Sequence, residues 1–159
     1  MSVLSALLWG AMLVAVYAVK PATVTWSDCS DATYHTKITR ADIPPNPTTG
    51  QNLTVVGYGN VDEPVTGGTY TLSGVLNGIP VLKHTHSVCG TDVVKVAGGI
   101  ATIYLNLLTC PTAAGEHSIS FDVFMTNLAP NGLFKATAKA VDAKGEPLLC
   151  LEIDVKIGA

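Results

Sequence analysis

The chain has 159 residues, of which Lys, Arg, Asp and Glu make up only 13%, and its net charge is −3 at pH 7. Such a composition provides no basic stripe that could neutralise a phosphate backbone, so we expect no nucleic-acid partner. Without an amino-terminal leader about 140 residues remain, enough for one domain with one hydrophobic core.

The first segment is apolar from Val3 to Tyr17, which is too short to span a bilayer comfortably. It ends with small residues at the positions that a signal peptidase reads, so we expect a signal peptide over residues 1–18 and a single domain over residues 19–159. The alternative is an uncleaved anchor, because no Lys or Arg precedes the apolar run. A cleaved leader would send the chain into the secretory route.

The rest of the chain has no helical periodicity, and Gly, Pro and Asn interrupt it at short intervals, which is typical of a β-sandwich. In residues 149–157 apolar and charged side chains alternate, which predicts a strand with one buried and one wet face. Asn77-Gly78 and Asn131-Gly132 suit tight turns, because these residues adopt positive φ at little steric cost. We therefore expect an all-β fold of two antiparallel sheets, with strands over residues 34–43, 51–58, 68–76, 79–86, 100–108, 117–126, 133–141 and 149–157.

Four cysteines follow the leader, namely Cys29, Cys89, Cys110 and Cys150. An even number in a chain that enters an oxidising compartment predicts two disulfides. The residues alone leave all three pairings open. A zinc site is the competing interpretation, but the chain has no Cys-x-x-Cys and no regular Cys/His spacing.

Sequence patterns typical of enzymes are missing. The chain has no Gly-x-Ser-x-Gly elbow, no phosphate-binding loop and no thiol left over once the cysteines pair. His84 and His86 would share one face of a strand and could share a metal, but we interpret them as part of a polar face. We therefore expect a protein that is not an enzyme and that holds neither a metal nor a cofactor.

Apolar residues make up 48% of the chain but aromatic residues only 6%. Phe134, Ala136, Ala138 and Ala140 would share one face of a strand, and the alanines would leave room opposite them for an apolar guest. The alternative is that facing side chains fill this space.

A series of short motifs runs from about Trp26 to Ile157. In chain order they are Trp26-Ser27-Asp28-Cys29, Pro45-Asn46-Pro47 followed by Gly50, Gly78-Ile79-Pro80-Val81, Cys89, Cys110-Pro111 followed by Gly115, and Leu148-Leu149-Cys150-Leu151-Glu152-Ile153. Their order and spacing resemble those of the ML domain, the lipid-recognition fold of the soluble Niemann-Pick type C cholesterol carrier and the fungal phosphatidylglycerol/phosphatidylinositol transfer proteins.

The resemblance implies a two-sheet immunoglobulin-like sandwich, an apolar tunnel for one sterol or phospholipid, and no active site. It also implies the disulfides Cys29–Cys150 and Cys89–Cys110. Two departures from the sterol carriers favour the transfer proteins: residues 43–47 replace a third, short-range disulfide, and the interval from Cys89 to Cys110 is longer.

From this resemblance we expect a secreted lipid-binding and transfer protein, or one in the lumen of the secretory or endolysosomal (vacuolar) pathway. It would be a monomer that touches a membrane surface transiently. The alternative function is a secreted structural or recognition module with a packed core and no lipid. Asn52 begins the sequon Asn52-Leu53-Thr54, which predicts glycosylation in a eukaryotic source. The candidate lipid-binding residues, chosen by strand alternation or bulk, are Leu72, Tyr104, Phe121, Val123, Met125, Phe134, Leu151 and Ile153.

Overall fold

The computed structural model describes residues 18–158. The predicted signal peptide therefore lies outside the described residues, apart from Ala18. Within residues 18–158, no helix has the length and apolar character needed to cross a bilayer.

The regular structure of the described residues consists of ten β-strands and one short 3-10 helix. Apolar side chains alternate with exposed ones along most of these strands, because successive side chains of a strand point to opposite faces. In chain order the elements are β1 (Ala22–Asp28), β2 (Thr36–Asp42), β3 (Asn52–Val61), β4 (Gly68–Leu76), β5 (Ile79–Ser87), β6 (Thr91–Val96), η1 (Ala97–Gly99), β7 (Ala101–Asn106), β8 (Gly115–Met125), β9 (Gly132–Asp142) and β10 (Pro147–Ile157).

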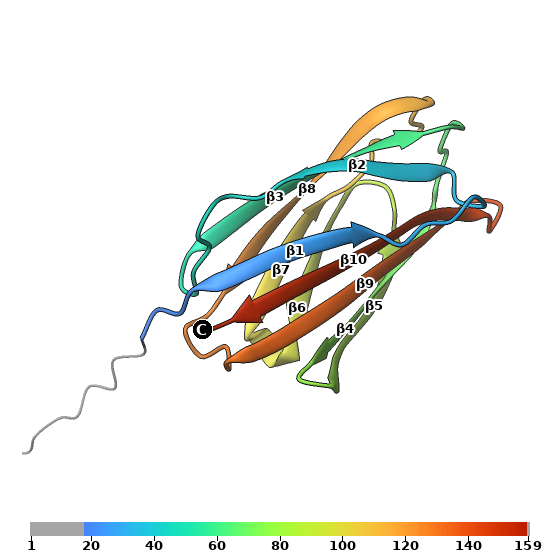
Figure 1. The fold of residues 1–159 in the computed structure, drawn as a ribbon. Helices are drawn as coiled ribbons and strands as arrows, with labels where there is room; N and C mark the ends of the chain where they lie inside the picture. The colour runs from blue at the N-terminus through green and yellow to red at the C-terminus, as the bar shows by residue number, and fades with distance from the viewer. Residues whose placement is uncertain (1–17, 159) are drawn as a thin grey trace, which may run out of the picture.

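The strands form two five-stranded sheets. The first sheet has the order β1-β10-β9-β4-β5 and the second the order β2-β3-β8-β7-β6, and all neighbouring strands are antiparallel. Figure 1 shows the two sheets stacked face to face in an elongated sandwich. The predicted all-β, immunoglobulin-like sandwich is confirmed.

Two of the ten strands, β1 and β6, were not predicted from the sequence. In β6 the consecutive residues Val93 and Val94 point to opposite faces, so that one is exposed and the other buried. Asp92 precedes them at a largely buried position, so apolar and polar side chains do not alternate regularly along this strand. β1 is a short edge strand that pairs only with β10 in its sheet, and its alternation is carried mainly by Val24 and Trp26.

The two disulfides pair the cysteines as the resemblance implies. Cys29, just after β1, is bonded to Cys150 in the neighbouring strand β10, across a sequence separation of 121 residues. Cys89, between β5 and β6, is bonded to Cys110, between β7 and β8, across 21 residues. In the chain-entropy model the longer loop contributes about 5 kcal/mol and the shorter one about 3 kcal/mol to the free energy of unfolding.

The buried apolar residues form two separate clusters. A domain usually has one contiguous core with smaller satellite clusters beside it, and the buried residues here follow that arrangement. The larger cluster contains Val61, Val65, Tyr70, Leu72, Val88, Val94, Leu105, Ala136, Ala140 and Leu148. The smaller cluster contains Ala22, Met125, Ala129 and Ile157.

Candidate functional site

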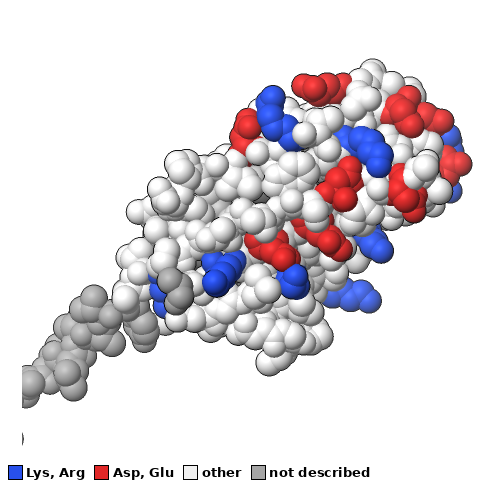
Figure 2. Space-filling view, in the orientation of Figure 1, with Lys and Arg blue, Asp and Glu red and all other residues white. Residues whose placement is uncertain are grey.

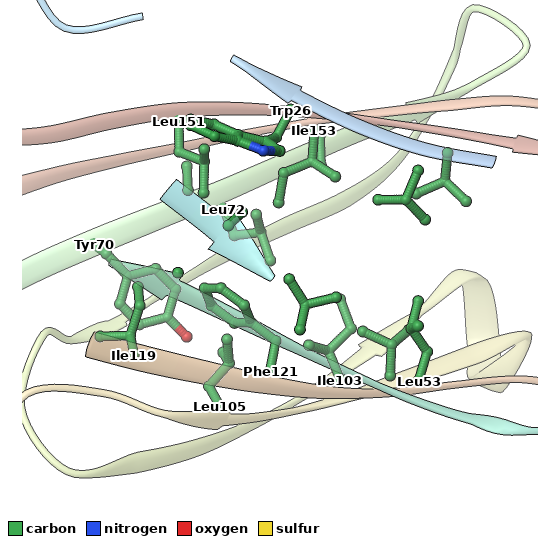
Figure 3. Close-up of a pocket in the computed structure, with 18 of the residues that line it drawn as sticks. Trp26, Leu53, Tyr70, Leu72, Ile103, Leu105, Ile119, Phe121, Leu151 and Ile153 are labelled. Atoms are coloured by element: carbon green, nitrogen blue, oxygen red, sulfur yellow. The ribbon is translucent and has the colours of Figure 1, made fainter. Parts of the chain in front are cut away.

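A cavity of about 230 Å³ lies between the two sheets. In Figure 3, Leu151 and Ile153 of β10 project into this space from the first sheet. Leu105 of β7 and Phe121 of β8 project into it from the second sheet. The wall is therefore built from the inward faces of both sheets and is almost entirely apolar.

Small side chains keep the space open. Ala136, Ala138 and Ala140 occupy successive inward positions on β9, the central strand of the first sheet. In the second sheet, Gly57 and Gly59 of β3 add no side chain to the wall. Interiors normally pack to the density of organic crystals, so a row of small residues in the middle of a sandwich leaves unfilled volume. The alternative that facing side chains fill the space does not hold here.

Several inward side chains keep part of their accessible surface. Val55, Ile103, Phe121 and Ile153 face the other sheet and line the cavity, yet each is only partly buried. In a filled core such residues would be fully covered by their neighbours. Their remaining surface is the surface that a guest molecule can cover.

The structure places all but one of the predicted residues on the cavity wall. Tyr104 is the exception and the prediction for it is wrong: its side chain is 51% exposed on the outer face of β7. Ile103 and Leu105, on either side of it, take the inward positions of that strand. The residues that line the cavity as predicted are Leu72, Phe121, Val123, Met125, Phe134, Leu151 and Ile153.

The sequence prediction also missed lining residues that the same alternation could have found. Ile119 shares the inward face of β8 with Phe121, and Ile103 shares that of β7 with Leu105. Trp26 and Ile38 lie on β1 and β2, the edge strands of the two sheets. Trp26 was noted only as part of a motif, because β1 was not recognised as a strand.

A polar cluster joins the sheets along another edge of the sandwich. Tyr70 of β4 lines the cavity and donates its hydroxyl hydrogen to Oδ2 of Asp92 on β6, at 2.6 Å. Nε2 of His84 on β5 lies 2.6 Å from the same oxygen, and the backbone N–H of Val93 donates to Oδ1 of Asp92. The rings of His84 and His86 are stacked with their centroids 6.1 Å apart. β5 and β6 are edge strands of different sheets, so this cluster spans the gap between them.

The environment of this cluster shifts the pKa values of Tyr70 and Asp92 in opposite directions. Burial raises the pKa of Tyr70 well above its usual range, and its hydrogen bond to the Asp92 carboxylate raises it further. Burial also acts to raise the pKa of Asp92, but the hydrogen bonds from Tyr70, His84 and Val93 outweigh it and lower this pKa below its ordinary value. Asp92 is thus held as a carboxylate that accepts hydrogen bonds from two strands of the other sheet.

A second polar cluster lies at an end of the sandwich, away from the cavity wall. One nitrogen of His35 and one carboxylate oxygen each of Glu63 and Glu146 lie within 4.8 Å of one another, which is close enough to hold a cation. Nζ of Lys144 lies 3.6 Å from both carboxylates and already balances part of their charge. Nδ1 of His35 is 2.9 Å from Oδ1 of Asp62. These groups form an exposed ion-pair network between three loops.

The comparison with known families matches the model of the ML domain to residues 23–157. The chain belongs to the ML domain family. The match spans nearly every strand of both sheets and therefore the whole wall of the cavity.

Individual relatives agree with this assignment. Over 136 residues the chain is 26% identical to a candidate phosphatidylglycerol/phosphatidylinositol transfer protein of Dictyostelium discoideum, covering 85% of this chain and 87% of that one. Over 135 residues it is 29% identical to the phosphatidylglycerol/phosphatidylinositol transfer protein of Mycosarcoma maydis, covering 84% of this chain and 65% of that one. The crystal structure of a Niemann-Pick type C2 protein from the Japanese carpenter ant superposes with a TM-score of 0.56 at 14% identity, covering 82% of this chain and 96% of that one. This last likeness is one of fold.

Proposed function

We propose that this protein shelters one lipid between its two sheets and carries it between membranes without catalysing a reaction. The observation that carries the proposal is the apolar cavity between the sheets. A lipid that crosses water must keep its apolar surface dry, and each Å² removed from water is worth about 25 cal/mol. The inward surface of both sheets supplies that shelter.

The cavity is smaller than a typical ligand pocket, so we expect it to widen when a lipid binds. About 230 Å³ is less than the roughly 300–1,000 Å³ of typical ligand pockets. The polar cluster around Asp92 joins the sheets along their β5–β6 side, and the larger buried cluster packs residues of both sheets together. We expect the central strands, which are lined by alanine and glycine, to move apart when a lipid enters.

A phospholipid is the ligand that we favour over a sterol. The relatives in Dictyostelium discoideum and Mycosarcoma maydis are named for phosphatidylglycerol and phosphatidylinositol. The replacement of a third disulfide by residues 43–47 and the long interval from Cys89 to Cys110 point the same way.

The proposed place of action is outside the cell or in the lumen of the secretory or endolysosomal (vacuolar) pathway. The signal peptide that the sequence predicts over residues 1–18 supports this. Two disulfides in a chain of this size are compatible with an oxidising compartment.

Asn52 is proposed as a glycosylation site if the source is eukaryotic. Its side chain is exposed at the start of β3, and the hydroxyl of Thr54 is turned to the carboxylate of Asp122 at 2.5 Å. Treatment with a glycosidase tests this: a loss of mass supports the site, and an unchanged mass for protein from a eukaryotic host contradicts it.

The alternative, a recognition module with a packed core, is less well supported because an apolar cavity lies between the sheets. Organic extraction of the purified protein followed by mass spectrometry separates the two functions. The carrier is expected to yield one lipid per chain and to move a fluorescent phosphatidylglycerol between vesicles. A protein that yields no lipid and shows no saturable binding of phospholipid or sterol would favour the recognition module.

A further inference from the structure

One end of the sandwich gathers loops from both sheets. Its segments are residues 19–21, 43–52, 76–80, 95–102, 124–133 and 155–158, and we call it the lysine end. Backbone hydrogen bonds run from Ala22 to Pro47 and from Gly50 to Met125, and the amine of Lys20 donates to the carbonyl of Ala129 at 2.5 Å. These contacts fix the beginning of β1, the loop before β3 and the loop after β8 side by side.

Charge is distributed unevenly along the sandwich. The segments of the lysine end contain Lys20, Lys95 and Lys156 and no Asp or Glu. The loops and strand ends at the opposite end, which we call the acidic end, are rich in acidic residues, namely Asp28, Asp31, Asp62, Glu63, Glu116, Asp142 and Glu146. Figure 2 shows this arrangement: red side chains gather at the end away from the grey residues, whereas the visible end beside the grey residues is white and blue.

The lysine end also exposes large apolar side chains. Ile79 at the β4–β5 turn is 66% exposed, and Leu128 in the β8–β9 loop is 60% exposed. Leu133 is 37% exposed and lies beside Lys156 in the pairing of β9 with β10. The side chain of Asn77 joins the two loops, because its Oδ1 accepts from the backbone N–H of Leu133 and its Nδ2 donates to the carbonyl of Asn131. The exposed apolar residues therefore belong to one connected surface.

The same surface is continuous with the cavity wall. In the β8–β9 loop Leu128 points to solvent, whereas Ala129 and Pro130, the next two residues, line the cavity. The smaller buried cluster lies at this end, and its members Met125 and Ile157 line the cavity. The larger cluster, with ten buried residues, lies elsewhere in the sandwich.

We propose that the lysine end docks on the surface of an anionic bilayer and is the end through which a lipid passes. Ile79, Leu128 and Leu133 would enter the interface between headgroups and acyl chains, while the lysines face lipid phosphates. The acidic end would be repelled by such a surface, so the charge distribution also orients the molecule. This inference rests on the proposed lipid-carrier function and names its membrane partner.

The proposed glycan would lie at the lysine end, because Asn52 belongs to one of its segments. Asn52 projects from the outer face of the second sheet, opposite in direction to the inward Leu53. Ile79 and Leu133 lie at the end of the first sheet. Docking is therefore tested both with wild-type protein and with Asn52→Gln protein, which carries no glycan.

Co-flotation with vesicles tests the proposal. The vesicles are either pure phosphatidylcholine or phosphatidylcholine with phosphatidylglycerol as the minor lipid. The wild type is expected to bind the anionic vesicles more tightly, with a preference that added salt reduces. The double variant Lys95→Glu/Lys156→Glu is expected to lose at least about tenfold in affinity, since each basic residue near an anionic surface is worth about fivefold. Leu128→Asp should weaken binding to both kinds of vesicle.

Lys144→Glu, at the acidic end, is the matched control and should leave vesicle binding unchanged. Retention of a preloaded fluorescent phospholipid in vesicle-free buffer is measured for every variant. Normal retention with lost vesicle binding supports the docking surface. Vesicle binding that is the same for the wild type and the double variant, or that Lys144→Glu lowers equally, overturns it. Failure of all proteins to hold any lipid in buffer would instead overturn the carrier function.

Discussion

Tyr70 donates a hydrogen bond of 2.6 Å to Asp92, and this bond joins the two sheets across the side of the cavity. Tyr70 is 7% exposed and lies on β4 of the first sheet, whereas Asp92 lies on β6, the edge strand of the second. This hydrogen bond therefore joins the two sheets along the side of the sandwich where their edge strands, β5 and β6, have no further strand to pair with.

Removal of the carboxylate is expected to destabilise the fold. Asp92→Ala leaves the Tyr70 hydroxyl buried without its acceptor, which costs about 1–3 kcal/mol of unfolding free energy. Asp154→Ala, which removes an exposed ion pair with Lys135, is the matched control and should change the free energy by less than about 1 kcal/mol. Urea unfolding measures both. Equal, small losses for the two variants would show that the contact between the sheets contributes little.

The same carboxylate predicts how stability depends on acid. The pKa of Asp92 is lower in the folded protein than its ordinary value of 3.8. Its ionisation therefore adds stability above about pH 4, and this contribution is lost as the pH falls through the lowered pKa of the folded state. The difference in unfolding free energy between the wild type and Asp92→Asn should shrink below pH 4. A difference that stays constant from neutral pH down to pH 2 would contradict the assignment.

His35 offers an independent titration at the acidic end. Its hydrogen bond to Asp62 is the main cause that raises the pKa of His35 above 6.5, and burial opposes it only in part. The stability gained from its protonation is present below pH 6.5 and is lost as the pH rises through the raised pKa. In an NMR titration, Asp62→Asn should move the pKa of His35 back toward 6.5. An unchanged midpoint would mean that this hydrogen bond does not control the titration.

Strand alternation was enough to predict much of the cavity wall. It placed Phe121, Val123 and Met125 on one face of β8, and Leu151 and Ile153 on one face of β10, where the structure has them. The prediction failed for Tyr104, which was chosen for the size of its side chain although the alternation along β7 places it on the outward face.

Other features depend on contacts that no local pattern encodes. Asp92 lies on the inward face of β6, a position that the local sequence does not predict for a carboxylate. Its hydrogen bonds with Tyr70 and His84 of the other sheet explain this position. The order of strands within the sheets depends on pairings between distant segments such as β1 and β10. Whether the row from Ala136 to Ala140 faces empty volume depends on the side chains of the opposite sheet, so the cavity itself required the structure.

The final prediction tests whether the cavity is the lipid site by filling it. Val123 on β8 lines the cavity, whereas its neighbour Phe124 is 37% exposed on the outer face of the same strand. Val123→Trp should occupy space between the sheets and lower lipid binding at least about tenfold, which corresponds to about 1.4 kcal/mol. Because the new side chain enters a cavity, it should avoid the roughly 1–3 kcal/mol that overpacking costs in a filled core. Phe124→Trp is the matched control and should bind lipid as the wild type does. Saturation binding of a fluorescent phospholipid, together with urea unfolding of each variant, measures both effects. If Val123→Trp unfolds much more readily and still binds lipid like the wild type, the lipid must lie somewhere other than between the sheets.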